Sequence, residues 1–210
     1  HLVHIQTFDW RDHRSRKIQS NQLARVKMSL PDKLNPALRD LPVYQPGLPL
    51  EEVAREIGLP SEQIIKLASN ENPFGPSPHA VTAMENSTAE MHRYPDGNAF
   101  SLRNQLADKL DVKPENLVFG NGSNEIIEFV ARSLLKPGDD IVVSQYCFAI
   151  YPIVAKMMGA KIIQTPAKQY GHDLLSMLQA VTVRTKIIFI ANPNNPTGTS
   201  ASKTEINDLI

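Results

Sequence analysis

The sequence has little cysteine, no excess of charge of either sign and no long apolar run. Its single cysteine, Cys147, excludes a disulfide within the chain and a cysteine-rich metal centre, and it favours a reducing compartment. The 22 basic and 22 acidic residues balance, so no overall field draws the chain to nucleic acid or to an anionic membrane. No apolar stretch reaches the roughly 18 residues of a membrane-spanning helix. We expect a cytoplasmic enzyme with no metal, nucleic-acid or membrane partner.

The first 27 residues differ in pattern from the remainder. They begin at His1 rather than at Met, contain the only Trp and follow neither helical nor strand periodicity. Met28 opens a stretch typical of a natural start, so we interpret residues 1–27 as an extension foreign to the protein. An Arg-rich transit peptide is the alternative, and Asp9 and Asp12 count against it.

Helix and strand signals alternate from Leu50 onward. Expected helices cover residues 51–58, 77–95, 100–110, 124–135, 148–159 and a final stretch from Lys203, with Ser77 as a cap and Gly58 as a stop. Short apolar strands are expected at 116–120, 140–144, 161–165 and 186–192. This alternation predicts an α/β fold of three layers, α/β/α, with a mostly parallel sheet. Ligands of such sheets bind at the carboxyl ends of the strands.

The loop after the first expected strand reads GNGSNEII, residues 120–127. Its two glycines allow a tight turn, and Ser123 opens a helix whose free N–H groups and positive dipole end suit a phosphate. Glu125 stands where the dinucleotide-binding pattern G-x-G-x-x-G needs its third glycine. The loop therefore indicates a phosphate cradle, and a turn without a ligand is about as plausible on this stretch alone.

Three aromatic residues, Tyr146, Phe148 and Tyr151, follow the second expected strand. An aromatic ring at this edge can lie flat on a planar ligand. It can equally fill the core beneath the next helix, which is the commoner fate of Phe and Tyr. On this stretch alone the core interpretation is favoured.

The segment NPNNPTG, residues 192–198, follows the fourth expected strand and is called the asparagine loop below. Its prolines restrict the backbone, and Gly198 permits a conformation closed to other residues. An asparagine held in this way can donate a hydrogen bond to a phenolate-type oxygen without adding charge. A plain asparagine-proline turn is the alternative. It is disfavoured because three loops are expected to converge on one edge of the sheet.

Five segments in this order resemble the fold-type I pyridoxal-phosphate aminotransferases, and most closely the histidinol-phosphate aminotransferases. The resemblance runs from about Leu41 to Ile210. It implies that residues 28–68 form an N-terminal arm and a small-domain segment, and that residues 69–210 form an incomplete, truncated large domain that binds pyridoxal phosphate. The segments are SNENPFGPSP (69–78), RYPD (93–96), FGNGSNEII (119–127), YCFAIY (146–151) and NPNNPTG (192–198).

The resemblance also implies roles for individual residues. Phe148 would stack on the pyridine ring of the cofactor, and Asn195 would bond its O3′ atom. Tyr94 would reach the cofactor phosphate of a partner subunit in a homodimer. Two further sets are implied: Gly122, Ser123 and Asn124 would hold the phosphate, and Tyr44, Asn70 and Asn72 would contact the substrate.

The implied reaction transfers an amino group from glutamate to imidazole-acetol phosphate, giving histidinol phosphate and 2-oxoglutarate in histidine biosynthesis. Alternatives in the same subfamily are an aromatic amino acid aminotransferase and a threonine-phosphate decarboxylase. An alternative of another class is a non-catalytic fragment that pairs with full-length subunits. A nucleotide-binding Rossmann protein is disfavoured by the broken glycine pattern.

The resemblance further implies groups that this chain does not contain. These are the lysine that forms a Schiff base with the cofactor, the aspartate that pairs with the pyridinium nitrogen, and an arginine for the substrate carboxylate. Lys203 follows the asparagine loop too closely to be that lysine, and we interpret it as a surface charge. We therefore expect no catalytic residue in the chain as given. We also expect strand 116–120 to lack its native neighbour, because later strands of the family lie between it and the other three.

Overall fold

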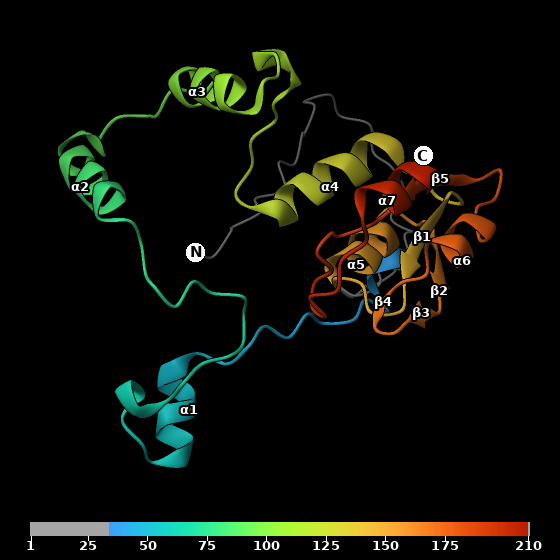
Figure 1. Ribbon diagram of the computed structural model, residues 1–210, viewed down its shortest axis with the longest axis horizontal. Helices are drawn as coiled ribbons and strands as arrows, with labels where there is room; N and C mark the ends of the chain where they lie inside the picture. The colour runs from blue at the N-terminus through green and yellow to red at the C-terminus, as the bar shows by residue number, and fades with distance from the viewer. Residues whose placement is uncertain (1–33, 210) are drawn as a thin grey trace, which may run out of the picture. The chain divides into compact units, whose positions relative to one another are not determined.

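Residues 34–209 are described by a computed structural model (Figure 1). The interpretation of residues 1–27 as a foreign extension lies outside the described residues. Pro36–Ile210 form one unit by their contacts. Within the described range, no helix is long and apolar enough to cross a membrane.

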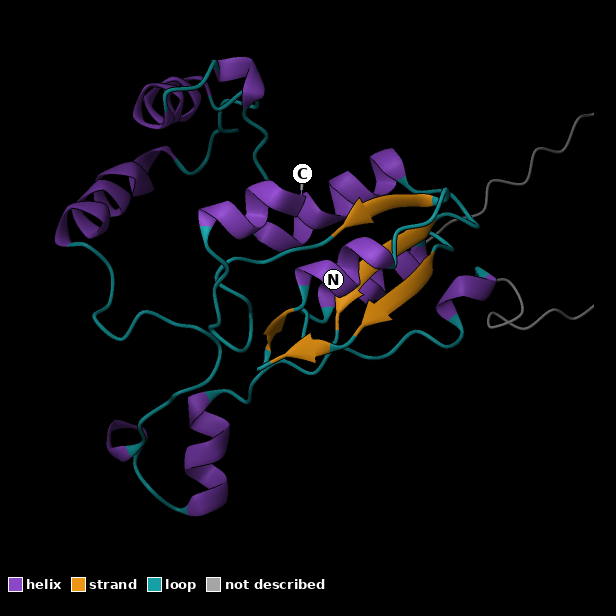
Figure 2. Ribbon diagram, turned by 45° about the vertical axis from the view of Figure 1, so that its right-hand side comes forward, coloured by secondary structure: helices purple, strands orange, loops and turns teal. Residues whose placement is uncertain are grey.

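A parallel sheet of three strands forms the centre of this unit (Figure 2). Strand β1, Asp140–Ser144, lies between β2, Lys161–Thr165, and β5, Thr185–Ile188. All five residues of β1 are buried, as expected for a near-continuous apolar run in a parallel sheet. The predicted strands 140–144 and 161–165 are confirmed. The fourth prediction, 186–192, was too long, because β5 ends at Ile188 and the chain turns into the asparagine loop.

Helices cover both faces of the sheet. Helix α4, Ser123–Leu134, and helix α5, Ile150–Met157, pack on the face that carries Ile141 and Val143. Val142 points to the opposite face, where α6, Leu174–Gln179, contacts β1 and carries the fully buried Met177. Helix α7, Lys203–Leu209, packs against α6. The α/β/α layering predicted from the sequence is therefore observed.

Residues 116–120, predicted as the first strand, are not a strand. A short 3₁₀ turn, η5 at Pro114–Asn116, leads into extended backbone at Leu117, and Val118 is 70% exposed. The described residues offer this segment no neighbouring strand. Instead the guanidinium of Arg103 donates to the carbonyl oxygens of Pro114 and Leu117, at 3.1 and 2.5 Å. It also lies 4.8 Å from the ring centroid of Phe119.

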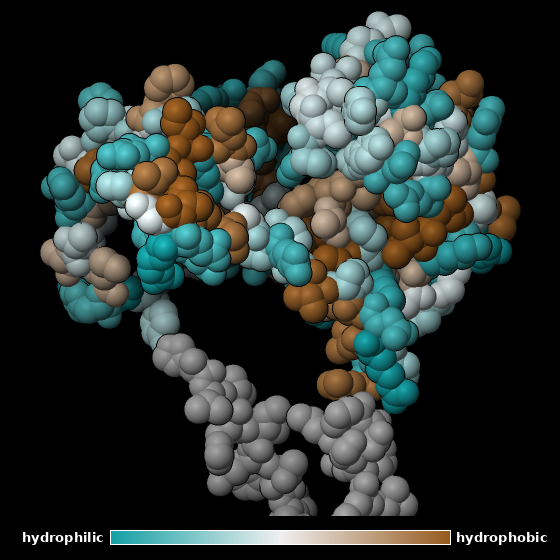
Figure 3. Space-filling model, turned by 90° about the horizontal axis from the view of Figure 1, so that it is seen from below, coloured by the Kyte–Doolittle hydropathy of each residue, from teal (hydrophilic) through white to brown (hydrophobic). Residues whose placement is uncertain are grey.

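Three helices precede α4: α1, Leu50–Ile57, α2, Pro78–Ser87, and α3, Phe100–Leu110. The predicted helices 51–58 and 100–110 are confirmed to within one residue. The predicted helix 77–95 was too long, because α2 ends at Ser87 and a short 3₁₀ turn, η4 at Thr88–Glu90, follows it. Helix α1 ends at Gly58 in the left-handed conformation, as predicted. Ser77 precedes α2, but its side chain makes no capping hydrogen bond. The leucines of α3 at positions 102 and 110 are exposed, and Figure 3 shows such apolar side chains, coloured brown, in several patches on one face of the molecule.

A small hairpin and helix α6 have no counterpart in the sequence predictions. Strands β3, Ala167–Lys168, and β4, Gly171–His172, pair antiparallel around Gln169 and Tyr170. Both turn residues have positive φ, 49° and 64°, in a turn that usually contains asparagine and glycine. Helix α6 is capped by Asp173, whose carboxylate accepts from the Ser176 N–H at 3.1 Å. The hairpin lacks the usual turn residues, which is why its sequence gave no signal.

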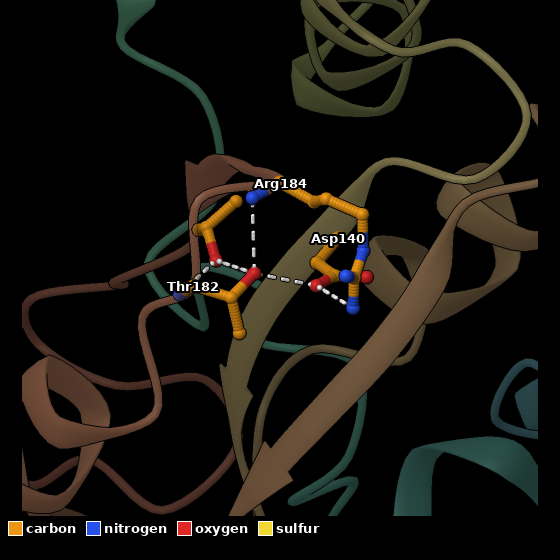
Figure 4. Close-up of polar contacts among 4 residues, drawn as sticks. Asp140, Thr182 and Arg184 are labelled. Carbon is orange, nitrogen blue, oxygen red and sulfur yellow. Dashed lines mark hydrogen bonds and ion pairs between the residues drawn. The ribbon is translucent and has the colours of Figure 1, made fainter.

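A buried polar cluster fixes the start of β1 (Figure 4). Asp140 is fully buried, and its Oδ2 atom accepts from the Thr182 hydroxyl at 2.6 Å and lies 3.2 Å from a nitrogen of Arg184. Across the sheet, Asp140 pairs with Thr185, and the register shifts at the next residue. The hydrogen bond from Thr182 and the charge of Arg184 hold the pKa of Asp140 below its usual value, although burial opposes this.

We expect this cluster to make the fold sensitive to acid. Because the folded pKa of Asp140 is depressed, its contribution is complete above the unfolded pKa of about 4 and is lost as pH falls through the folded value. An Asp140→Asn variant should therefore lose less of its free energy of unfolding between pH 5 and the acid limit than the parent chain. Urea unfolding at a series of pH values measures this. Parallel curves for parent and variant would contradict the assignment.

Candidate functional site

The loops that follow β1 and β5 meet at the carboxyl edge of the sheet. Since the two strands are parallel neighbours, both loops leave from the same edge. The side-chain amide of Asn194 donates to the carbonyl oxygen of Tyr146 at 3.0 Å and so joins them. Asn194 is 4% exposed. The structure thus brings the segment of Phe148 and the segment of Asn195 together, as the sequence predicts.

Two of the three asparagines in the asparagine loop are engaged in holding the loop. Asn192 exchanges two hydrogen bonds with the backbone of Ala201, both at 2.9 Å. Asn194 donates to Tyr146 and, at 2.8 Å, to the hydroxyl of Thr197. Among the described residues, no group bonds the side chain of Asn195, which is half-buried. The free amide of the loop therefore belongs to the asparagine that the resemblance assigns to the cofactor.

The backbone of the loop closes on itself. The N–H of Asn194 donates to the Thr199 carbonyl at 2.7 Å, and the N–H of Gly198 donates to the Asn194 carbonyl at 2.8 Å. Gly198 has a φ of 72°, in the left-handed region that favours glycine. These bonds confirm the prediction of a rigidly held loop.

The predicted phosphate cradle lies at the start of α4. Gly122 precedes the helix with φ 83° and ψ 175°, a conformation essentially limited to glycine. The N–H groups of Ser123 and Asn124 are exposed at the helix start, where no carbonyl of the described chain accepts from them. Ser123 is the first helical residue rather than the cap, which is a correction to the sequence prediction.

Glu125 orders this cradle, a role that the sequence analysis missed. Its carboxylate accepts from the N–H of Asn121 at 2.6 Å, one turn back along the chain. A Cβ atom at Gly120 would lie 2.9 Å from this carboxylate, so glycine permits the close approach. An acid at the third position of a helix is a known capping signal and could have revealed the contact.

Phe148 belongs to a row of four aromatic rings. The ring of Tyr44 lies 6.5 Å away and that of Tyr151 5.7 Å away, both edge-on, and Tyr151 stacks on Phe189 at 4.4 Å. Phe148 also packs against the core cluster of the sheet. Burial raises the pKa of the neighbouring Cys147 thiol. Phe148 is thus half-buried against the core, and the predicted substrate residue Tyr44 lies beside it.

The remaining predicted residues lie on exposed segments. Asn72 bonds its own turn, accepting from the N–H of Phe74 at 3.1 Å and donating to the Gly75 carbonyl at 3.0 Å. Asn70 has a positive φ of 55° and is exposed. A Cβ atom at Gly47 would lie 2.8 Å from the hydroxyl oxygen of Ser69, so the arm that carries Tyr44 approaches this loop. Tyr94 is fully exposed.

Lys203 is exposed at the first position of α7, as predicted for a surface charge. The residue before it caps the helix, because the Ser202 hydroxyl and N–H both bond the Glu205 carboxylate, at 2.8 and 2.7 Å. Ser202 therefore has a structural role as the cap of α7, and Lys203 follows it as the first helical residue. Among residues 34–209, no group of His, Cys, Asp and Glu side chains could hold a metal ion.

A pocket of about 730 Å³ lies between the β3–β4 hairpin, residues 198–201 and α7. None of the residues predicted to contact the cofactor lines it. Its acids include Asp173 and Glu205, whose carboxylates already bond helix starts. The pocket therefore borders the exit of the asparagine loop at Gly198, but it does not contain the residues predicted to contact the cofactor.

Comparisons with known proteins place these features in context. Residues 62–210 match the family of class I and II aminotransferases. The chain is 51% identical over 173 residues to histidinol-phosphate aminotransferase of Methylobacillus flagellatus, which covers 82% of this chain and 47% of that protein. It is 48% identical over 175 residues to histidinol-phosphate aminotransferase 2 of Pseudomonas fluorescens, covering 83% and 47%. The chain thus spans about half the length of these relatives.

Solved structures share the fold. The crystal structure of histidinol-phosphate aminotransferase from Sinorhizobium meliloti in complex with pyridoxal 5′-phosphate superposes with a TM-score of 0.71 at 22% identity, over 84% of this chain and 47% of that chain. A Thermus thermophilus aspartate aminotransferase mutant superposes with a TM-score of 0.63 at 25% identity, over 68% and 42%. The fold described above is therefore shared with these structures over less than half of their own length.

Proposed function

Because the chain belongs to the class I and II aminotransferase family, we propose that it is the cofactor-binding part of an aminotransferase that uses pyridoxal phosphate. Its substrates are histidinol phosphate or imidazole-acetol phosphate, with glutamate and 2-oxoglutarate as the amino donor and acceptor. The observation that carries this choice is the identity of about half of all aligned residues with histidinol-phosphate aminotransferases. In this proposal residues 28–68 form the arm and small-domain segment, and residues 69–210 form part of the large domain.

The groups at the carboxyl edge suit the chemical parts of the cofactor. The free N–H groups of Ser123 and Asn124, at the positive end of α4, would bind the phosphate. The half-buried ring of Phe148 would stack on the pyridine ring. The free amide of Asn195 would donate to the ring oxygen O3′ without adding a charge. When bound, pyridoxal phosphate would act as an electron sink that weakens the bonds at the amino-bearing carbon of the substrate.

The substrate side is proposed from the exposed segments. Tyr44 and Asn70 would meet the substrate phosphate and line its entrance, since their two segments approach one another at Gly47 and Ser69. The side chain of Asn72 would hold the loop in shape, because its amide is engaged in its own turn. Tyr94 would contact the cofactor phosphate of a second subunit, a role that its full exposure permits.

The binding of pyridoxal phosphate to the purified chain tests the proposal. We expect pyridoxal phosphate to bind more tightly than pyridoxal, which lacks the phosphate, by about tenfold or more, because charge-assisted hydrogen bonds to the cradle contribute roughly 1.5–3 kcal/mol. Equilibrium titration followed by cofactor absorbance measures both affinities. Equal affinities, or no binding of either compound, would rule out the proposed cradle.

A further inference from the structure

The β3–β4 hairpin contacts both ends of the asparagine loop. At the entrance, the Nε2 atom of His172 lies 2.9 Å from the carbonyl oxygen of Ala191. Because that oxygen can only accept, Nε2 carries the hydrogen and donates. At the exit, the hydroxyl of Thr199 donates to the carbonyl oxygen of Tyr170 at 3.4 Å. One short hairpin therefore holds the residues that immediately flank the loop.

A single chain of hydrogen bonds runs through the loop to the hairpin. It starts at the Tyr146 carbonyl, which accepts from Asn194, and continues to Thr197 and then Thr199, whose hydroxyl oxygens are 3.0 Å apart. Thr199 has one hydroxyl hydrogen, so a bond from Thr199 to Tyr170 requires that Thr197 donate to Thr199. The two residues at the ends of this chain of bonds, Tyr146 and Tyr170, also contact each other through their rings, whose centroids are 5.6 Å apart.

The turn of the hairpin is shaped for this contact. Gln169 and Tyr170 both adopt the left-handed conformation, which is unfavourable for residues with a side chain. A Cβ atom at Gly171 would lie 3.2 Å from the Thr199 hydroxyl oxygen, a tight contact, so the hairpin backbone lies close to Thr199. Residues with an unfavourable backbone conformation cluster at functional sites, and these two lie in the hairpin that contacts the asparagine loop.

We propose that the β3–β4 hairpin positions the amide of Asn195, with Thr199 and His172 as its positioning residues. Asn192 and Asn194 hold the loop from within, and the hairpin holds it from outside, so Asn195 alone is left to face a ligand. A hydrogen bond to a ring oxygen depends on direction, and small displacements weaken it. The inference rests on the proposed function only in taking that ligand to be pyridoxal phosphate.

A matched pair of variants at Thr199 tests the inference. Thr199→Val removes the hydroxyl with little change of shape, and Thr199→Ser keeps it. We expect Thr199→Val to speed hydrogen exchange at the amides of Asn194 and Gly198 by about three- to tenfold, and to weaken binding of pyridoxal phosphate by a similar factor. The absorption band of the bound cofactor should also shift, because the bond to O3′ affects the ionisation of that oxygen. Thr199→Ser should match the parent chain in all three measurements.

A second pair guards against a general loss of structure. His172→Leu removes the donor to Ala191, and we expect it to change hydrogen exchange and cofactor binding as Thr199→Val does. His172→Gln retains an N–H that can reach Ala191, and we expect smaller changes in both measurements. Equal hydrogen exchange and equal binding in Thr199→Val and Thr199→Ser would overturn the inference. If the parent chain bound no pyridoxal phosphate, the proposed function would fail. Unchanged hydrogen exchange in Thr199→Val would show, independently of cofactor binding, that the hairpin does not hold the asparagine loop.

Discussion

A Gly122→Ala variant is expected to bind pyridoxal phosphate about five- to 150-fold more weakly than the parent chain. The backbone of Gly122, at φ 83° and ψ 175°, lies in a region essentially closed to alanine, at a cost of about 1–3 kcal/mol. No atom lies within 4 Å of the added methyl group, so the effect would come from the backbone and not from a clash. The loop would relax, and the N–H groups of Ser123 and Asn124 would turn away from a phosphate.

Gly97→Ala is the matched control. Gly97 also has open space around its Cβ position, but it does not need a positive φ. Its alanine variant should bind pyridoxal phosphate as the parent chain does, and pyridoxal should bind both variants and the parent alike. A Gly122→Ala variant with unchanged affinity for pyridoxal phosphate would show that the start of α4 does not hold the phosphate.

Ile141→Ala is expected to lower the free energy of unfolding by about 2–5 kcal/mol, the cost of a cavity in a packed core. Ile141 is fully buried at the centre of the sheet, in the cluster that joins β1 to helices α4 and α5. Whole domains are stable by only about 5–15 kcal/mol, so this change is a large fraction of the total. Urea unfolding followed by far-ultraviolet circular dichroism measures it.

Val183→Ala provides the comparison for that experiment. Val183 is 96% exposed, and its truncation should change the free energy of unfolding by less than about 0.5 kcal/mol. If both variants unfolded at the same urea concentration as the parent, the sheet described above would not be the stable core of the chain.

The strands and helices with strong local patterns could be predicted from the sequence. Strands β1 and β2 were predicted to the residue, because DIVVS and KIIQT are short apolar runs bounded by turn residues. Residues 116–120 have a similar apolar run but form no strand. Pairing needs a neighbour that lies far away in sequence or outside the described chain, and no local pattern contains that information.

The loops that form the candidate site could be predicted from the sequence, but the hydrogen bonds that connect them could not. The sequence placed Phe148 and Asn195 at one edge of the sheet, and the parallel order of β1 and β5 is the reason. It did not reveal that Asn194 links the two loops, or that Thr199 and His172 join them to a hairpin. These contacts connect residues 19 to 48 positions apart, so they follow from the tertiary fold alone.

The paired rings of Tyr146 and Tyr170 give the loop an optical signature. Two phenol rings at 5.6 Å and tilted by 31° form a chiral arrangement, so their electronic transitions couple and become optically active in the near ultraviolet. Tyrosine dichroism would therefore follow the closeness of hairpin and loop as temperature or solvent changes, before any cofactor is added.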